Sequence, residues 1–120
     1  MYLWSAIAAL NAALAVAAGA FGAHALKARL SPEMLAAFET GARYHFFHAL
    51  GLFAVAFLMG QGLRVQGAGI SLLLGILLFS GSLYALALSG IRVLGAVTPV
   101  GGLAFLVGWI WVAVVCIRAR

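Results

Sequence analysis

Long apolar runs separated by short polar connectors dominate the chain. The runs cover about residues 3–26, 42–60, 67–89 and 96–117, and each would form a helix about 28–36 Å long at about 1.5 Å per residue. Because the hydrocarbon core of a bilayer is about 30 Å thick, each run is long enough to cross it. The pattern predicts four transmembrane helices in a single domain over residues 1–120.

The connectors determine how these four helices are arranged. The second and third connectors, residues 61–66 and 89–94, are short, so neighbouring spans must lie side by side and antiparallel. We therefore expect an all-α membrane protein, an up-down antiparallel bundle of four transmembrane helices with both termini on one side.

The first connector is longer and has a helical pattern of its own. Ser31 followed by Pro32 is typical of a helix start, and apolar side chains recur at helical spacing after them. We predict a short amphipathic interfacial helix over residues 31–41, between the first two spans. The alternative is a lead-in to the second span, with Gly41 as a soft joint.

Composition supports the membrane interpretation and excludes several functional classes. Hydrophobic residues make up 67% of the 120 residues and charged residues 8%, with a mean hydropathy of +1.20. In soluble domains about 45–50% of the residues are apolar and about 25% are charged. The formal net charge of +5 comes from Lys and Arg residues scattered at the ends of the apolar runs. Without a basic patch we expect no nucleic-acid partner. The single cysteine, Cys116, excludes a disulfide framework.

Small residues recur four positions apart in three of the spans. Lipid solvates large aliphatic side chains as well as protein does, so helices in a bilayer associate through close packing and hydrogen bonds. We interpret the small residues as packing faces within the bundle, with a homodimer contact as the alternative. We also expect the alanine-rich first span to be surrounded by the others. The predicted packing residues are Ala15, Gly19 and Ala23 in the first span, Gly67, Ser71 and Gly75 in the third, and Ala104 and Gly108 in the fourth.

Uncharged polar side chains gather at one end of the predicted bundle. The first and third spans end, and the second and fourth begin, at the same membrane face, where Thr98 is expected to cap the fourth helix. We therefore predict a candidate polar cluster in one leaflet. Its members are His24, Tyr44, His48, Ser80, Ser82, Tyr84 and Thr98.

These imidazoles and hydroxyls have two interpretations. Ionisable groups inside a membrane are costly and mark candidate functional sites, here a proton or small-molecule site, or a metal or haem site. The structural interpretation, which we favour, is that they cross-link helices by hydrogen bonds, and Asn11 in the middle of the first span has the same two interpretations. No carboxylate lies in any predicted span, which argues against an ion pump or a di-metal carboxylate site. On the structural interpretation we expect no bound metal or cofactor and no catalytic residue.

Four motifs in order along the chain resemble a known family. They are GAFGAHALK at residues 19–27, TG with Tyr44 and HAL at residues 40–50, FSGSLY at residues 79–84, and TPVGG at residues 98–102. In these motifs the chain resembles the YgdD-type family, small bacterial inner-membrane proteins of unknown function related to a small vertebrate transmembrane protein. The resemblance implies four membrane helices, an inner-membrane location and cytoplasmic termini. It implies no activity, substrate or catalytic residue.

Two positions depart from the pattern of that family. His45 stands where relatives tend to carry Gln, and Arg43 stands where an acidic residue can occur. The resemblance therefore makes His45 a poor candidate for a metal ligand and leaves His24 paired with His48.

The sequence supports one leading functional hypothesis and one alternative. The leading hypothesis is a multi-pass integral membrane protein without enzymatic activity, which acts through helix–helix contacts with itself or within a larger membrane complex. The alternative is a protein that binds or conducts a small solute, a proton, a lipid or a quinone through the polar cluster.

Overall fold

The computed structural model describes residues 1–120 except for the side chain of Ala23, whose predicted packing role lies outside the described residues. The described part of the chain is helical and contains no strand. Within it, four segments are long and apolar enough to cross a membrane, namely Tyr2–Leu26, Pro32–Gly60, Gln66–Ser89 and Arg92–Arg118. The predicted all-α fold with four spans is confirmed.

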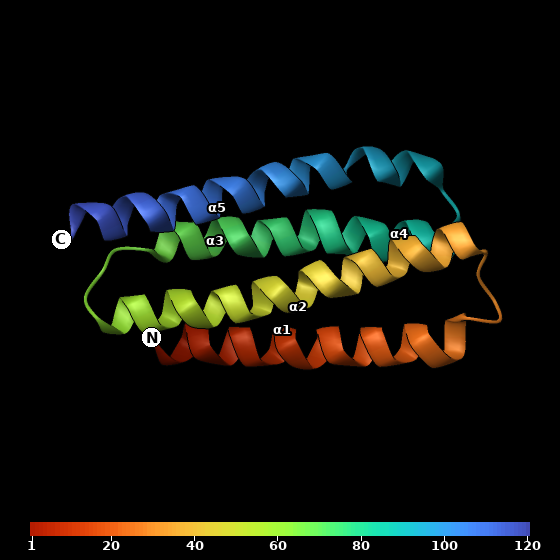
Figure 1. The fold of residues 1–120 in the computed structure, drawn as a ribbon, viewed down its shortest axis with the longest axis horizontal. Coiled ribbons are helices and arrows are strands. Elements are labelled where there is room, and N and C mark those ends of the chain that lie inside the picture. Colours follow the sequence, from red (N-terminus) through yellow and green to blue (C-terminus); the bar gives the residue numbers. More distant parts are fainter.

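The first, third and fourth spans each combine more than one helical element. In chain order the elements are α1 (Tyr2–Phe21), the π-helical turn η1 (Gly22–Leu26), α2 (Pro32–Gly60), α3 (Gln66–Gly75), the π-helical turn η2 (Ile76–Ser80), α4 (Gly81–Ser89), the 3₁₀ turn η3 (Arg92–Ala96) and α5 (Thr98–Arg118). The spans alternate in direction, so both termini lie at the same end of the bundle (Figure 1).

Helix α2 begins much earlier than the predicted second span. The Ser31 hydroxyl accepts a hydrogen bond of 3.2 Å from the Met34 N–H, and Pro32 is the first helical residue. The helix then continues without a break to Gly60. A separate interfacial helix over residues 31–41 was therefore the wrong prediction, and the alternative of a lead-in to the second span is the one observed. With 29 residues, α2 is about 44 Å long.

Gly41 is not a joint in this helix, because tertiary packing holds it in place. A Cβ atom added here would lie 3.1 Å from a ring carbon of Tyr84, 3.2 Å from the Cβ of Leu83 and 3.3 Å from the carbonyl oxygen of Ser80. Helix α4 therefore packs directly on the α2 backbone. This contact outweighs the low helix propensity of glycine, which costs about 1 kcal/mol relative to alanine.

The central spans are packed more tightly than the outer ones. Figure 1 shows α1 and α5 at the two edges of the bundle, with α2 and α3 between them. The most apolar stretch is 44% buried in the second span and 33% in the third, but 18% in the first and 17% in the fourth. The expectation that the first span is surrounded by the others is wrong, because α1 packs mainly on α2.

Two apolar clusters lie on either side of the middle of α2. The larger one is near the termini and includes Trp4, Leu52, Val55 and Leu72, and the smaller one, at the opposite end, is formed by Leu26, Phe38 and Ala87. The polar residues of the interior lie between these two clusters.

Small residues allow α5 to lie close to the third span. At three glycines a side chain from the facing helix fills the space that a Cβ atom would need, and a hydroxyl bridges the two helices at a fourth position. The pairs are Gly67 with Trp111, Gly75 with Phe105, Gly108 with Leu72, and the Ser71 hydroxyl, which donates a hydrogen bond of 2.6 Å to the carbonyl oxygen of Ala104.

In the first span the close contact lies elsewhere than expected. Ala15 is 3% exposed and faces α2, but among the described residues no atom lies within 4 Å of a Cβ added at Gly19. The close approach occurs at Gly22 instead, where the Phe38 ring would lie 2.7 Å from a Cβ atom. Gly19 is therefore not a packing residue within this bundle.

Gly101 marks a backbone-to-backbone contact between α5 and η2. A Cβ atom there would overlap backbone atoms of Leu78 and Phe79, whereas a Cβ atom at Gly102 would meet only the Phe79 ring, at 3.9 Å. We expect Gly101→Ala to lower the free energy of unfolding by about 1–3 kcal/mol, because the facing backbone cannot move aside. The control Gly102→Ala should change it by less than about 0.5 kcal/mol. Equilibrium unfolding in mixed micelles measures both variants, and equal effects would contradict the contact.

Candidate functional site

His45 connects three helices through a chain of hydrogen bonds. Its Nε2 atom lies 3.0 Å from the Oδ1 atom of Asn11 on α1, and its Nδ1 atom lies 3.0 Å from the hydroxyl of Tyr84 on α4. His45 itself is buried near the middle of α2. This chain links the first, second and third spans across the interior of the bundle.

The position of each proton in this chain follows from the groups at its end. The Asn11 side-chain nitrogen donates a hydrogen bond of 2.9 Å to the carbonyl oxygen of Ile7. Because a carbonyl only accepts, the orientation of the Asn11 amide is fixed and its oxygen faces His45. The Nε2 atom of His45 must then donate, and in a neutral imidazole the Nδ1 atom accepts from the Tyr84 hydroxyl. A neutral His45 is therefore protonated on Nε2.

His48 connects α2 to α5 and has the opposite tautomer. Its Nδ1 atom lies 2.7 Å from the carbonyl oxygen of Tyr44, and the indole N–H of Trp109 donates to its Nε2 atom over 3.0 Å. An indole nitrogen only donates and a carbonyl only accepts, so the proton of His48 lies on Nδ1. The ring is stacked on Phe105 with 3.5 Å between the ring centroids.

All four ring nitrogens of these two histidines are thus used in hydrogen bonds. Among the described residues there is no group of three or more His, Cys, Asp or Glu side chains able to hold a metal ion. Binding of a metal to either histidine would require one of these hydrogen bonds to break.

Ser82 and Thr98 join α4 to α5. The Ser82 hydroxyl donates a hydrogen bond of 2.9 Å to the carbonyl oxygen of Phe79 and lies 2.6 Å from the Thr98 hydroxyl, which therefore donates to Ser82. The prediction that Thr98 caps the fourth helix is wrong. Thr98 is already the first helical residue of α5, and Val97, whose side chain has no hydrogen-bonding atom, is the N-cap residue.

The structure does not bring His24 together with His48. His24 lies exposed in η1, at the level where α2 begins, whereas His48 lies several turns further along α2. The pairing was expected because the second span was predicted to begin at residue 42. With α2 extended to Pro32, His48 lies near the middle of its helix instead of near its end. Ser80, Ser82 and Tyr84 lie in the second half of the third span, and Thr98 is the first residue of α5.

Two other predicted members contribute less than expected. The side chain of Tyr44 is 38% exposed. Its ring packs on Phe79 at 4.8 Å between centroids and is stacked with the His48 ring at 6.2 Å, but its hydrogen bond to His48 uses the backbone carbonyl oxygen. The Ser80 hydroxyl is fully buried and has no hydrogen-bond partner among the described residues.

The predicted polar cluster left out three residues that organise the interior, namely Asn11, His45 and Trp109, although Asn11 had been interpreted separately as a residue that joins helices by hydrogen bonds. One signal was available for the first two. Each is a polar residue near the middle of an apolar run, and antiparallel pairing of the first two spans places Asn11 and His45 at the same depth. The family resemblance argued against His45 only as a metal ligand and says nothing against its role in joining helices.

The fold and its buried hydrogen bonds define a multi-pass membrane protein with four spanning helices. Residues 18–102 match the family model described as "Protein of unknown function (DUF423)". The chain belongs to the DUF423 family. The expected likeness to a family of small membrane proteins of unknown function is confirmed, with DUF423 as the description of that family.

The chain is also similar to several bacterial UPF0382 membrane proteins over nearly its whole length. It is 47% identical over 122 residues to YwdK of Bacillus subtilis, covering 98% of each chain. It is 44% identical over 115 residues to SSP2132 of Staphylococcus saprophyticus, covering 95% of this chain and 96% of the relative. It is 41% identical over 119 residues to SERP0230 of Staphylococcus epidermidis, covering 98% of each. No solved structure matches this chain.

We expect the two buried histidines to show opposite tautomers in the membrane-embedded protein. The hydrogen-bond partners require the proton of His45 on Nε2 and that of His48 on Nδ1. Imidazole ¹⁵N chemical shifts from solid-state NMR of the protein in lipid distinguish the two forms. The variant Trp109→Phe should shift the Nε2 resonance of His48 and leave His45 unchanged. The same tautomer at both positions would contradict the assignment.

The hydrogen bond between Asn11 and His45 should make a modest contribution to stability. Side-chain hydrogen bonds between membrane helices average about 0.6 kcal/mol and reach about 1.7 kcal/mol. We expect a coupling energy in this range from a double-mutant cycle of Asn11→Ala and His45→Ala, measured by equilibrium unfolding. As a control, Asn11→Ala and Ser71→Ala remove separate hydrogen bonds and should be additive within about 0.5 kcal/mol. Additivity of Asn11→Ala and His45→Ala would argue against the bond.

Proposed function

We propose that this protein is a non-enzymatic membrane protein that acts through helix–helix contacts, and that the outer face of α1 is the contact surface. The first partner we propose for this face is a second copy of the chain, with contacts in a larger membrane complex as the alternative occupant.

The observation that carries this proposal is a difference between the two outer helices. Both are mostly exposed, with 18% of the most apolar stretch buried in the first span and 17% in the fourth. Helix α1 also exposes large side chains, among them Leu10, Leu14 and Val16, but the strip directly opposite its buried residues is small. The exposed face of α5 carries Val100, Leu103, Leu106, Val107, Ile110, Val114 and Ile117. The face of α1 opposite its buried residues carries Ala6, Ala9, Ala13, Ala17 and Ala20.

The size of these side chains decides what each face can contact. Large aliphatic side chains are well solvated by lipid tails, so the outer face of α5 is suited to lipid. Small side chains allow a second helix backbone to approach closely, and van der Waals packing at short range is a main source of helix association in a bilayer. An α1–α1 contact would use the same face on both copies and would form a closed dimer.

The buried polar residues support a structural role for the interior. Both ring nitrogens of His45 and of His48 are engaged by groups within the bundle, and the Ser82 hydroxyl bridges to Thr98. Side chains held this way are suited to joining helices, which supports the non-enzymatic part of the proposal.

One observation favours the alternative of ligand binding. The chain from Asn11 to Tyr84 ends in two largely apolar hollows between α1 and the third span. Asn11 lines one of about 410 Å³ and Tyr84 lines one of about 490 Å³. An amphiphile with a polar group, such as a lipid or a quinone, would suit these hollows. We rank this second, because the polar atoms at both ends already have partners inside the protein.

The location we propose is the bacterial inner (plasma) membrane, with both termini in the cytoplasm. Arg64, Arg118 and Arg120 flank the spans at the end where the termini lie, and cytoplasmic flanks are enriched in Lys and Arg. The opposite end carries basic residues as well, so support for this orientation also comes from the family resemblance, which implies cytoplasmic termini.

Disulfide cross-linking in native membranes tests the α1 contact. In a Cys116→Ser background, Ala13→Cys on the outer face of α1 should form a covalent dimer on mild oxidation. The control Val107→Cys, on the exposed face of α5, should form at least tenfold less covalent dimer. Ala17→Leu added to the α1 variant should reduce the dimer, because a larger side chain keeps the backbones apart. Equal cross-linking at both positions, or none at Ala13→Cys with monomeric protein in lipid nanodiscs, would count against the proposal and favour the alternative.

A further inference from the structure

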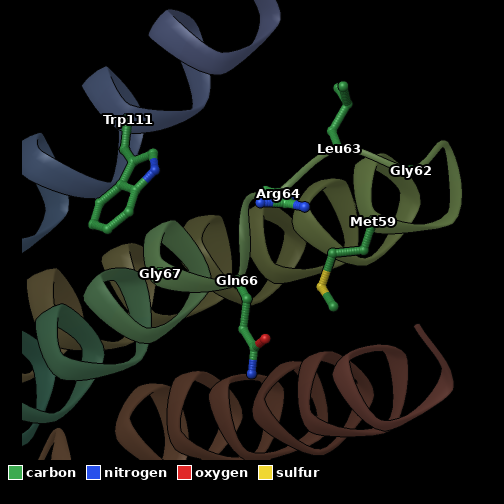
Figure 2. A pocket seen from close by; sticks show the side chains of 7 residues that line it. All are labelled: Met59, Gly62, Leu63, Arg64, Gln66, Gly67 and Trp111. Atoms are coloured by element: carbon green, nitrogen blue, oxygen red, sulfur yellow. The ribbon is translucent and has the colours of Figure 1, made fainter.

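A pocket opens at the end of the bundle where the two termini lie. Its volume is about 550 Å³, and it is formed by the end of α2, the connector to α3, the start of α3 and one side chain from α5. In Figure 2, Trp111 points from α5 toward the pocket, and the Arg64 side chain lies near its middle. The lining residues are Met59, Gly62, Leu63, Arg64, Gln66, Gly67 and Trp111.

The connector backbone holds Arg64 at this position. Gly62 adopts a left-handed conformation with φ of +85°, and the N–H groups of Gly62 and Leu63 donate to the carbonyl oxygens of Met59 and Leu58 over 2.9 and 3.1 Å. This pattern ends α2 and reverses the chain. Val65, on the other side of Arg64, is fully buried in the apolar core. Arg64 is therefore anchored on both sides.

The wall opposite the connector depends on a glycine. A Cβ atom at Gly67 would overlap the Trp111 ring, so the glycine allows the indole to lie against the first turn of α3. Trp111 therefore forms a flat apolar side of the pocket.

The polar groups of the pocket favour an anion. Arg64 supplies a guanidinium, which binds a phosphate or carboxylate through two parallel hydrogen bonds, and Gln66 supplies an amide. The N-terminus of α3 has no side-chain cap and no acidic residue in its first turn, so its free N–H groups add a partial positive charge. Both acidic side chains of the chain, Glu33 and Glu39, lie in the first part of α2 at the opposite end, where Glu33 already pairs with Arg92 at 3.1 Å.

From this combination we infer that the pocket binds the phosphate head group of an anionic phospholipid in the leaflet next to the termini, with Arg64 as the principal ligand. The apolar walls decide between a lipid and a free phosphate ion. Met59, Leu63 and Trp111 offer surface for the glycerol and the first acyl carbons of a lipid, which a free ion lacks. Tryptophan is also enriched at the depth of membrane head groups. The inference is independent of the proposed α1 contact, because none of its lining residues belongs to α1.

Lipid binding to the purified full-length protein in detergent tests this inference. The probes are dioleoyl-phosphatidylglycerol, dioleoyl-phosphatidylcholine and inorganic phosphate, and the readouts are the lipid retained in native mass spectrometry and the shift in Tm. We expect phosphatidylglycerol to bind at least tenfold more tightly than phosphatidylcholine and to raise Tm. Inorganic phosphate at equal concentration should have no effect.

Variants that remove one positive charge each distinguish lipid binding in this pocket from nonspecific attraction by the other basic residues at the same end. Arg64→Gln should weaken phosphatidylglycerol binding at least tenfold, and Arg64→Lys should weaken it less because the charge remains. The control Arg118→Gln removes the same charge at the same end, outside the pocket, and should leave binding within twofold. Equal losses in Arg64→Gln and Arg118→Gln, no preference for phosphatidylglycerol, or equal stabilisation by free phosphate would overturn the inference. Native mass spectrometry reports binding even if a variant has a lower Tm.

Discussion

The rest of the bundle depends on two imidazoles one turn apart on a single helix. His45 holds α1 through Asn11 and α4 through Tyr84, and His48 holds α5 through Trp109. Inside a bilayer no water competes for these groups, and an unpaired polar atom there is costly. Each side chain therefore has few acceptable partners, which fixes the rotation of each outer helix about α2.

These hydrogen bonds set direction, while close contact between backbones provides most of the attraction. Lipid tails leave no hydrophobic gain for burying a leucine, so van der Waals contact at short distance must hold the helices together. The third and fourth spans satisfy this along their length, from Gly67 to Gly101. Helix α1 satisfies it on one face only, at Ala15 and Gly22. Its alanine-rich opposite face has the same kind of surface that elsewhere in the molecule lies against a helix.

Features set by local sequence were predictable, and those set by contacts between distant segments were not. The four spans follow from the length of the apolar runs, and the start of α2 at Ser31 follows from local capping. The continuity of α2 through Gly41 depends on its contact with α4, which no local pattern encodes. Because the second span was predicted to begin at residue 42, His48 was expected near its end, whereas His48 lies near the middle of the longer helix. The link between His45 and Asn11 required the relative rotation of two helices, which hydropathy alone does not specify.

The π-helical turn η2 sets the rotational orientation of α4 relative to α3 within the third span. A π-helical turn contains one residue more than an α-helical turn, and each residue turns an α-helix by about 100°. The orientation of α4, with Ser82 toward Thr98 and Tyr84 toward His45, therefore depends on the number of residues between Ile76 and Ser80. A change in length that this turn did not absorb would rotate both hydroxyls by about 100° about the helix axis, away from these partners. In this span the number of residues, and not only their chemistry, sets where the hydroxyls point.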